Sequence, residues 1–270
     1  MSIWPADLAA LGASIHERGL VLGARLQHRE RTESTNDDAK AGAKAGAEHG
    51  TVWIAEHQES GRGRQGRAWA SPPGENVLMS VLVRGRFAPQ RVALAALVTG
   101  LAVRAALAEA LPERVVRLKW PNDVQVVTAT GPRKLAGILV EAQSRGAMLE
   151  SLVIGIGINV HTRVFPDDLA HRASSVALEG GLPDRARLVA DVLGYLDRHL
   201  AVVLERGLGS LHAELERHDA LLGMQVESES GGGVAEGIDA EGRLLVRDTA
   251  GEIHAWGSGE VHLVPVPAAP

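Results

Sequence analysis

The chain has 270 residues, of which 45% are hydrophobic and 23% are charged, and its formal net charge is -5. These values are typical of a soluble globular protein with a sizeable core, and they weigh against gross disorder. Because the chain contains no cysteine, it cannot form disulfides, thiolate metal sites or a thioester on its own side chains.

The N-terminal sequence MSIWPADLAA lacks the basic and apolar regions of a signal peptide, so we expect a cytoplasmic protein. The longest apolar segment covers residues 89–111. Arg91, Arg104 and Glu109 interrupt it, which favours a buried or amphipathic helix over a membrane span. We therefore expect no membrane partner. The acidic net charge and the lack of a dense Lys/Arg run also weigh against a nucleic-acid partner.

Hydrophobic periodicity and turn signals predict the remaining elements in chain order. A short helix is expected over 6–22, and a second helix begins at Ser34, Thr35 or Asn36. The other predicted elements are strands over 51–57 and 76–84, a helix over 89–111, strands over 115–120, 134–143 and 149–160, and helices over 185–207 and 208–218.

The pattern changes near residue 220. From about Gly223 onward, short β-like runs alternate with glycine turns, which is typical of a small β-barrel. We therefore predict two domains, residues 1–220 and residues 221–270.

The sequence GRGRQGRAW, residues 61–69, contains the G-x-G-x-x-G spacing of a dinucleotide-binding turn. Such a turn needs a helix directly after it, whereas Pro72-Pro73-Gly74 indicate more loop. No GK[ST] sequence is present, so a P-loop is excluded. Flexible glycines beside arginines predict a mobile loop that binds anions. A solvated turn or an RGG-like nucleic-acid segment remain alternatives.

Three further stretches contain residues suited to chemistry. In KWPNDV, residues 119–124, Lys119 could meet a phosphate and Asp123 could hold Mg²⁺. Lys134 lies at the start of an apolar strand, and Asn159 in GIGINV could hydrogen-bond a purine edge. Each also has a plain structural explanation: a proline turn at a strand end, a solvent-facing lysine, and an asparagine in a turn.

Taken together, and in this order, the motifs resemble those of bacterial biotin–protein ligases, also called biotin–[acetyl-CoA carboxylase] ligases. The matching stretches are ESTN (33–36), AEHQESGRGRQGRAW (55–69), KWPND (119–123), KLAGILVE (134–141) and GIGIN (155–159). The resemblance covers roughly residues 25–265. One such motif is weak evidence, whereas five in order are specific.

The resemblance implies an α+β fold. Its catalytic domain is similar to class II aminoacyl-tRNA synthetases, with a mixed sheet flanked by helices, and a small SH3-like β-barrel follows at the C-terminus. It also implies a two-step reaction. Biotin and ATP, with Mg²⁺, form biotinyl-5'-AMP, and biotin is then transferred to a specific lysine of a biotin carboxyl carrier protein domain of acetyl-CoA carboxylase or a related carboxylase.

The resemblance also implies roles for individual residues. The expected biotin ligands are Ser34, Thr35, Asn36, Gln58, Arg62, Gly63, Arg64 and Lys134. The expected nucleotide ligands are Lys119, Asn122, Arg67, Trp69 and Asn159, the catalytic residues are Lys134, Asp123, Arg64 and Lys119, and Asp123 is the expected metal ligand.

The chain departs from the family pattern in two ways. Gln65 stands where the family often has arginine, so one contact to phosphate or within the loop is in doubt. Some relatives carry an N-terminal helix-turn-helix, for which the roughly thirty residues before ESTN are too few, so we expect no specific DNA binding.

Exposed sheet edges could pair with the carrier or with a second copy of the chain in a homodimer.

Three alternatives remain at this stage. A lipoate–protein ligase-like acyltransferase would share the fold and the adenylate chemistry, but it lacks the arginine-rich loop. A non-catalytic biotin sensor would bind without consuming ATP. An RGG-type RNA-binding protein would show strongly salt-dependent affinity for RNA.

Overall fold

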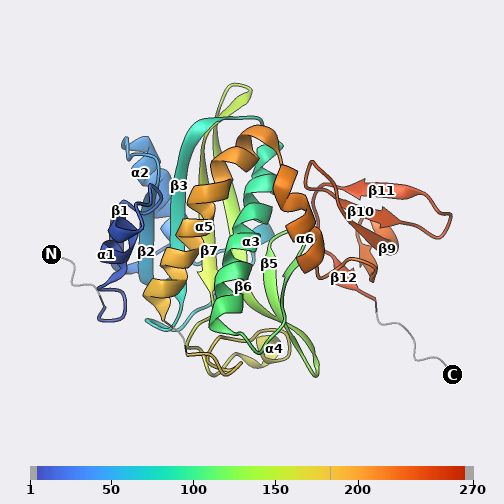
Figure 1. Ribbon diagram of the computed structural model, residues 1–270, viewed down its shortest axis with the longest axis horizontal. Coiled ribbons are helices and arrows are strands. Elements are labelled where there is room, and N and C mark those ends of the chain that lie inside the picture. The colour runs from blue at the N-terminus through green and yellow to red at the C-terminus, as the bar shows by residue number, and fades with distance from the viewer. Residues whose placement is uncertain (1–4, 183, 265–270) are drawn as a thin grey trace.

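A seven-stranded sheet forms the centre of the computed structural model, which describes residues 5–182 and 184–264 (Figure 1). The outer limits of the two expected domains, at residues 1 and 270, lie outside these ranges. The strand order is β1-β2-β3-β7-β6-β5-β4, with β1 and β2 parallel and all other neighbours antiparallel. The strands are β1 (Arg25–Thr32), β2 (Thr51–Gln58), β3 (Val77–Phe87), β4 (Val116–Lys119), β5 (Asp123–Thr128), β6 (Gly131–Arg145) and β7 (Met148–Ile158).

Helices cover both faces of this sheet, in agreement with the predicted mixed sheet flanked by helices. They are α1 (Leu11–Glu17), α2 (Thr35–Lys44), α3 (Arg91–Ala110), α4 (Asp167–Ala170), α5 (Arg185–Arg206) and α6 (His212–His218). Alternate residues of β2 point to opposite faces. Val52 and Ile54 face the main core, to which α3 and α5 contribute, whereas Trp53 packs with Ala39 and Ala43 of α2.

Helix α3 is the long apolar segment seen in the sequence. By length and composition it is the one helix among the described residues that could cross a membrane, and 61% of its most apolar stretch is buried. It packs against α5 and against the sheet, side by side with α5 in Figure 1. The expectation of a buried helix is therefore confirmed.

A second, five-stranded antiparallel sheet follows at the C-terminus, at the right of Figure 1. Its order is β11-β10-β9-β8-β12, and its strands are β8 (Gln225–Ser228), β9 (Gly231–Ile238), β10 (Leu244–Arg247), β11 (Ile253–Trp256) and β12 (His262–Leu263). The buried indole of Trp120, between β4 and β5, donates a hydrogen bond at 2.9 Å to the carbonyl of Gly242, in the turn between β9 and β10, so a direct bond joins the C-terminal part of the chain to the part that contains the larger sheet.

The structure corrects two expectations and adds two strands. The N-terminal helix covers only Leu11–Glu17, and residues 208–218 form a 3₁₀ turn, η2 (Gly209–Leu211), followed by α6. Strands β1 and β5 were not predicted. The polar sequence RLQHRERT of β1 is tolerated because β1 is an edge strand with most side chains exposed. The expected turn at Pro121 is the connection of a hairpin that continues into β5.

Gly42 of α2 gives a first test of the packing. Alanine is usually favoured over glycine inside a helix by about 1 kcal/mol, but a Cβ at Gly42 would collide with the indole of Trp53. We predict that Gly42→Ala lowers the free energy of unfolding by about 1–3 kcal/mol, measured by urea denaturation. Gly194→Ala in α5 is the matched control, because a Cβ there meets nothing closer than 3.7 Å. It should be neutral or stabilising, and equal effects of the two changes would contradict the packing described here.

Asp219 lies where the chain leaves α6 for the small sheet, and its side chain is buried with 2% of the residue exposed. Its Oδ1 accepts a hydrogen bond from the backbone N–H of Leu221 at 2.8 Å, while Oδ2 has no partner among the described residues. Burial raises the pKa of this carboxyl to about 6.

This shift predicts a pH-dependent stability. Between the ordinary pKa and about pH 6 the folded chain keeps a proton that the unfolded chain has lost, so this group makes stability fall as pH rises. Asp219→Asn should therefore gain about 2 kcal/mol of stability relative to the native chain between about pH 4.5 and about pH 7.5. Urea denaturation at both pH values measures this gain. A difference that stays constant with pH would show that Asp219 is not the group responsible.

Candidate functional site

Residues from the separate sequence motifs meet on the face of the sheet that α2 covers. Gly137 of β6 pairs with Gly157 of β7, and the indole of Trp69 lies directly over them. A Cβ at Gly157 would come within 2.6 Å of this ring, and one at Gly155 would collide with the amide of Asn36. The glycines of KLAGILVE and GIGIN are thus required by close approach of side chains, rather than by unusual backbone angles.

One end of the site is neutral and polar. Ser34, Thr35 and Asn36 begin α2 and are all buried. The Oε1 of Gln58 accepts hydrogen bonds from the backbone N–H and the hydroxyl of Thr35, at 2.8 and 2.9 Å. The hydroxyl of Ser34 makes no capping bond to α2. This end therefore presents hydroxyl and amide groups that can hydrogen-bond an uncharged polar ligand.

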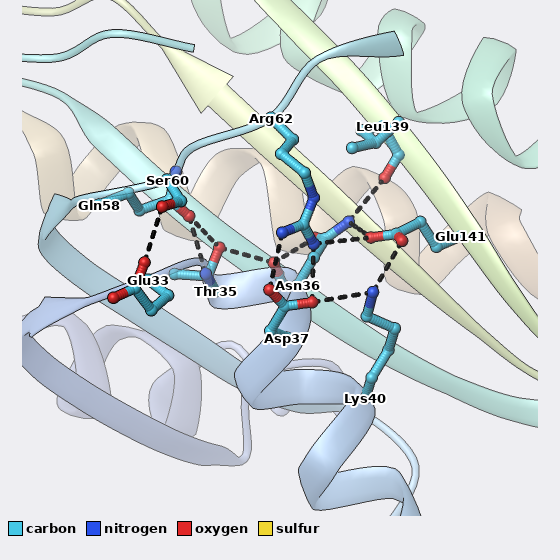
Figure 2. A network of polar contacts seen from close by, with 11 residues as sticks. Glu33, Thr35, Asn36, Asp37, Lys40, Gln58, Ser60, Arg62, Leu139 and Glu141 are labelled. Atoms are coloured by element: carbon cyan, nitrogen blue, oxygen red, sulfur yellow. Dashed lines mark hydrogen bonds and ion pairs between the residues drawn. The ribbon is translucent and has the colours of Figure 1, made fainter. Parts of the chain in front are cut away.

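Asn36 is held in one orientation by its neighbours. Its Oδ1 lies 2.6 Å from the hydroxyl of Ser80, and its Nδ2 donates to Glu141 Oε2 at 2.6 Å and to the Leu139 carbonyl at 3.4 Å (Figure 2). Both protons of the amide are therefore used within the protein. Asn36 shapes the neutral end, since it has little hydrogen-bonding capacity left for a ligand.

The glycine–arginine loop forms a small hairpin above the sheet. The backbone N–H of Trp69 donates to the Gly61 carbonyl at 2.8 Å, and that of Gly63 donates to the Arg67 carbonyl at 2.7 Å. A single 3₁₀ turn, η1 (Arg64–Gly66), forms its tip, so no helix follows the glycines. Gln65 is exposed and has a left-handed backbone with φ 55°.

The three arginines of the loop point to three different parts of the protein. Arg62 binds the Asp37 carboxylate with both terminal nitrogens at 2.7 Å. Arg64 donates to the side-chain oxygen of Asn122 at 3.3 Å. Arg67 forms an ion pair with Glu260, which precedes β12. The hydrogen bond from Arg67 lowers the pKa of the Glu260 carboxyl.

The other end of the site is cationic. Lys134 Nζ lies 2.6 Å from Asp123 Oδ1 and 5.5 Å from the centre of the Trp69 ring. Burial lowers the pKa of Lys119, and Asp123 and Glu260 oppose that shift only in part. Burial also lowers the pKa of Arg64. Desolvated cations are stabilised by a bound anion, so this end is suited to a phosphate or a carboxylate.

The expected residues do not all face this site equally. Asn122 donates its amide to the Ile138 carbonyl at 2.8 Å while its oxygen accepts from Arg64, so it lies beside the cationic end. Asn159 is buried, and its amide donates to the Ser174 carbonyl at 3.0 Å. This bond ties β7 to the segment after it and leaves the amide only partly free for a ligand.

Sequence reasoning did not single out several residues that the structure brings here, namely Asp37, Lys40, Ser80, Glu141 and Glu260. Asp37 and Glu141 stand directly beside or inside quoted motifs, so their place in the sequence was a usable signal, although their pairing with Arg62 was not. No signal in the sequence pointed to Glu260, because it lies 193 residues from its partner Arg67.

Known proteins are similar to this chain in sequence and in fold. Residues 29–159 match the Biotin/lipoate A/B protein ligase family, and residues 224–264 match the Biotin protein ligase C terminal domain. The biotin–[acetyl-CoA-carboxylase] ligase of Mycobacterium tuberculosis is 36% identical over 240 residues, which is 85% of this chain and 85% of that protein.

Two further comparisons bear on the extent of the likeness. The bifunctional ligase/repressor BirA of Salmonella typhimurium is 34% identical over 79% of this chain, and the chain spans about two thirds (67%) of that relative's length. The solved structure of the biotin protein ligase from Aquifex aeolicus in complex with biotin and ATP matches with a TM-score of 0.75 and 29% identity. The match covers 90% of this chain and 99% of that one.

Proposed function

The chain belongs to the biotin protein ligases, and we propose that it joins biotin to a protein in two steps. In the first step, a biotin carboxylate oxygen attacks the α-phosphorus of ATP, which forms biotinyl-5'-AMP and releases pyrophosphate. In the second step, the amine of a carrier lysine attacks the carbonyl carbon of the adenylate. An amide bond forms, AMP leaves, and the amine gives up a proton.

The observation that carries this proposal is the division of the site into a neutral polar end and a cationic end. Biotin has a neutral ureido group at one end and a carboxylate at the other. Ser34, Thr35 and Gln58 suit the ureido group, because they offer hydroxyl and amide partners. Lys134 and Arg64 suit the carboxylate and the α-phosphate, which repel each other until cations neutralise both.

The remaining expected residues fit roles around these two ends. We assign Lys119 to the phosphates, Arg67 to the nucleotide side of the loop through its pair with Glu260, and Asn122 to positioning Arg64. Trp69 lies over the glycine pair beside Lys134, where its ring can separate the biotin tail from water. We assign Asn159 to the adenine side, where its amide holds the segment around Ser174 in place.

Asp123 is suited to a magnesium ion that arrives with ATP. Mg²⁺ in such enzymes is held by one or two carboxylates together with substrate phosphates and water. Asp123 Oδ1 is buried and makes an ion pair with Lys134 without hydrogen-bond geometry, so it keeps capacity to ligate a cation. Bound there, the ion would neutralise phosphate charge. In this proposal Asp123 also accepts the proton of the incoming carrier lysine.

The loop of residues 61–69 covers the site and would protect the adenylate from water. Glycines allow the loop to fold tightly and to lie close to the sheet: a Cβ at Gly61 would come within 2.5 Å of the Trp69 carbonyl, and one at Gly157 within 2.6 Å of the Trp69 ring. In this proposal the backbone of Arg62 and Gly63 lies over biotin, and Arg64 closes over the adenylate phosphate. The loop opens in part for the carrier lysine.

The acceptor in this proposal is a biotin carboxyl carrier protein domain of acetyl-CoA carboxylase or a related carboxylase. A lipoate–protein ligase-like activity is the nearest alternative, but lipoate has no ureido group for Ser34, Thr35 and Gln58 to bind. A sensor that only binds biotin would not need Lys134 and Asp123 in contact at the cationic end.

The first half of the reaction is tested by biotin-dependent exchange of pyrophosphate into ATP. The native chain should catalyse exchange with biotin and not with lipoate. Lys134→Ala should reduce the exchange rate by about 100- to 1000-fold, with only a modest loss of biotin affinity, because Lys134 stabilises charge that develops at the α-phosphate.

Lys44→Ala is the matched control, since Lys44 is an exposed lysine at the end of α2. It should exchange at the native rate. Near-native exchange in Lys134→Ala would contradict the role of Lys134, and exchange with neither acid in the native chain would overturn the proposed function.

A further inference from the structure

The side chain of Arg62 points toward Asp37 of α2 (Figure 2). Its Nη1 and Nη2 donate to the two oxygens of Asp37, each at 2.7 Å. A bidentate pair of this kind fixes both distance and orientation. Since Asp37 lies in the first turn of α2, the pair fastens the glycine–arginine loop to that helix.

A second layer of charged groups supports Asp37. Lys40, one turn further along α2, lies 2.9 Å from Asp37 Oδ1 and donates to Glu141 Oε1 at 2.8 Å. Glu141, on β6, accepts the Asn36 amide and lies 3.8 Å from Arg62. The network therefore joins the loop, α2 and β6, as the dashed contacts in Figure 2 show.

The charges in this network balance. Two cations, Arg62 and Lys40, meet two carboxylates, Asp37 and Glu141. The hydrogen bond from Arg62 holds the pKa of Asp37 well below its ordinary value, and the same bond raises the pKa of Arg62. Little positive charge remains here to bind a biotin carboxylate or a phosphate.

Arg64 differs in each of these respects. Among the described residues, its one hydrogen bond to a side chain is to the neutral amide of Asn122, at 3.3 Å. Burial lowers its pKa, and the Asp123 and Glu260 carboxylates oppose that shift without bonding to it directly. Neighbouring arginines of one loop are thus in opposite states, one paired within the protein and one available to an anion.

We propose that Asp37 is a positioning residue that latches the glycine–arginine loop through Arg62, and that the Arg62 guanidinium binds the protein and not the substrate. The effect on catalysis rests on the proposed function, whereas the latch itself does not. The latch holds the loop over the site before substrate binds, and Arg64 is the loop arginine that meets the reacting anions.

The latch is tested first on the ligand-free protein by limited trypsin digestion. Asp37→Asn leaves every arginine of the loop in place but removes one charged partner, so the loop should open more often. Cleavage after Arg62, Arg64 or Arg67, followed by mass spectrometry, should become several-fold faster, because proteolysis reports the population of the open form.

Glu236→Gln is the matched control for this digestion. It breaks another bidentate pair, in which Arg247 binds Glu236 at 2.5 and 2.7 Å on the small sheet. Cleavage within the loop should stay at the native rate in this variant. Native-like cleavage of the loop in Asp37→Asn would overturn the latch.

Catalysis distinguishes a positioning residue from a substrate ligand. If Arg62 acts through Asp37, Asp37→Asn and Arg62→Lys should both raise the biotin KM in the exchange reaction roughly three- to tenfold. Their kcat should remain close to native, and bound biotinyl-5'-AMP should be released faster. The double variant should be no worse than either single variant, because both changes break one interaction.

A direct substrate contact predicts a different result. Arg62→Lys would then lose activity while Asp37→Asn remained native or improved, and the double variant would follow Arg62→Lys. That outcome would overturn the assignment. If the native chain formed no biotinyl-5'-AMP, the proposed function would fail, and the trypsin digestion would still decide whether Asp37 holds the loop.

Discussion

The site depends on the pairing of Gly137 with Gly157 on adjacent strands of the central sheet. This pair leaves a strip of the sheet without side chains, and the indole of Trp69 occupies it. The glycine–arginine loop can then lie flat on the sheet, and Lys134 can extend past the ring to Asp123. Any Cβ in this strip would lift the loop and separate the two ends of the site.

The arrangement places a neutral polar end and a cationic end on one face of the sheet, with the Trp69 ring beside Lys134 at the cationic end. Hydroxyl and amide groups at the start of α2 form hydrogen bonds with defined geometry. Lys119 and Arg64 are half-buried, which lowers their pKa, and a bound anion would offset that cost. An acid with a polar head and a carboxylate tail fits this site, with its head at the neutral end and its carboxylate at the cationic end. A triphosphate fits beside the tail, where the small sheet contributes Glu260 as a counter-charge.

Much of this site was predictable because its chemistry lies in short motifs. Lys134, Asp123 and Ser34 each stand in a run of residues whose local pattern fixes a strand end or a helix start. The directions of the arginines were not predictable, since they depend on partners brought close only by folding. Asp37 is 25 residues from Arg62, and Glu260 is 193 residues from Arg67. The polar edge strand β1 was missed for a related reason: its pairing with β2, and not its own hydrophobic pattern, makes it a strand.

The central claim is that one site activates biotin and passes it to a protein lysine. The most direct measurement is the mass of a purified biotin carboxyl carrier domain after incubation with the chain, biotin and MgATP. The account predicts a gain of one biotinyl group that requires both biotin and ATP and disappears when the acceptor lysine of the carrier is changed to arginine. An unchanged carrier mass under conditions where biotinyl-5'-AMP forms, or an equal gain with lipoate, would contradict it.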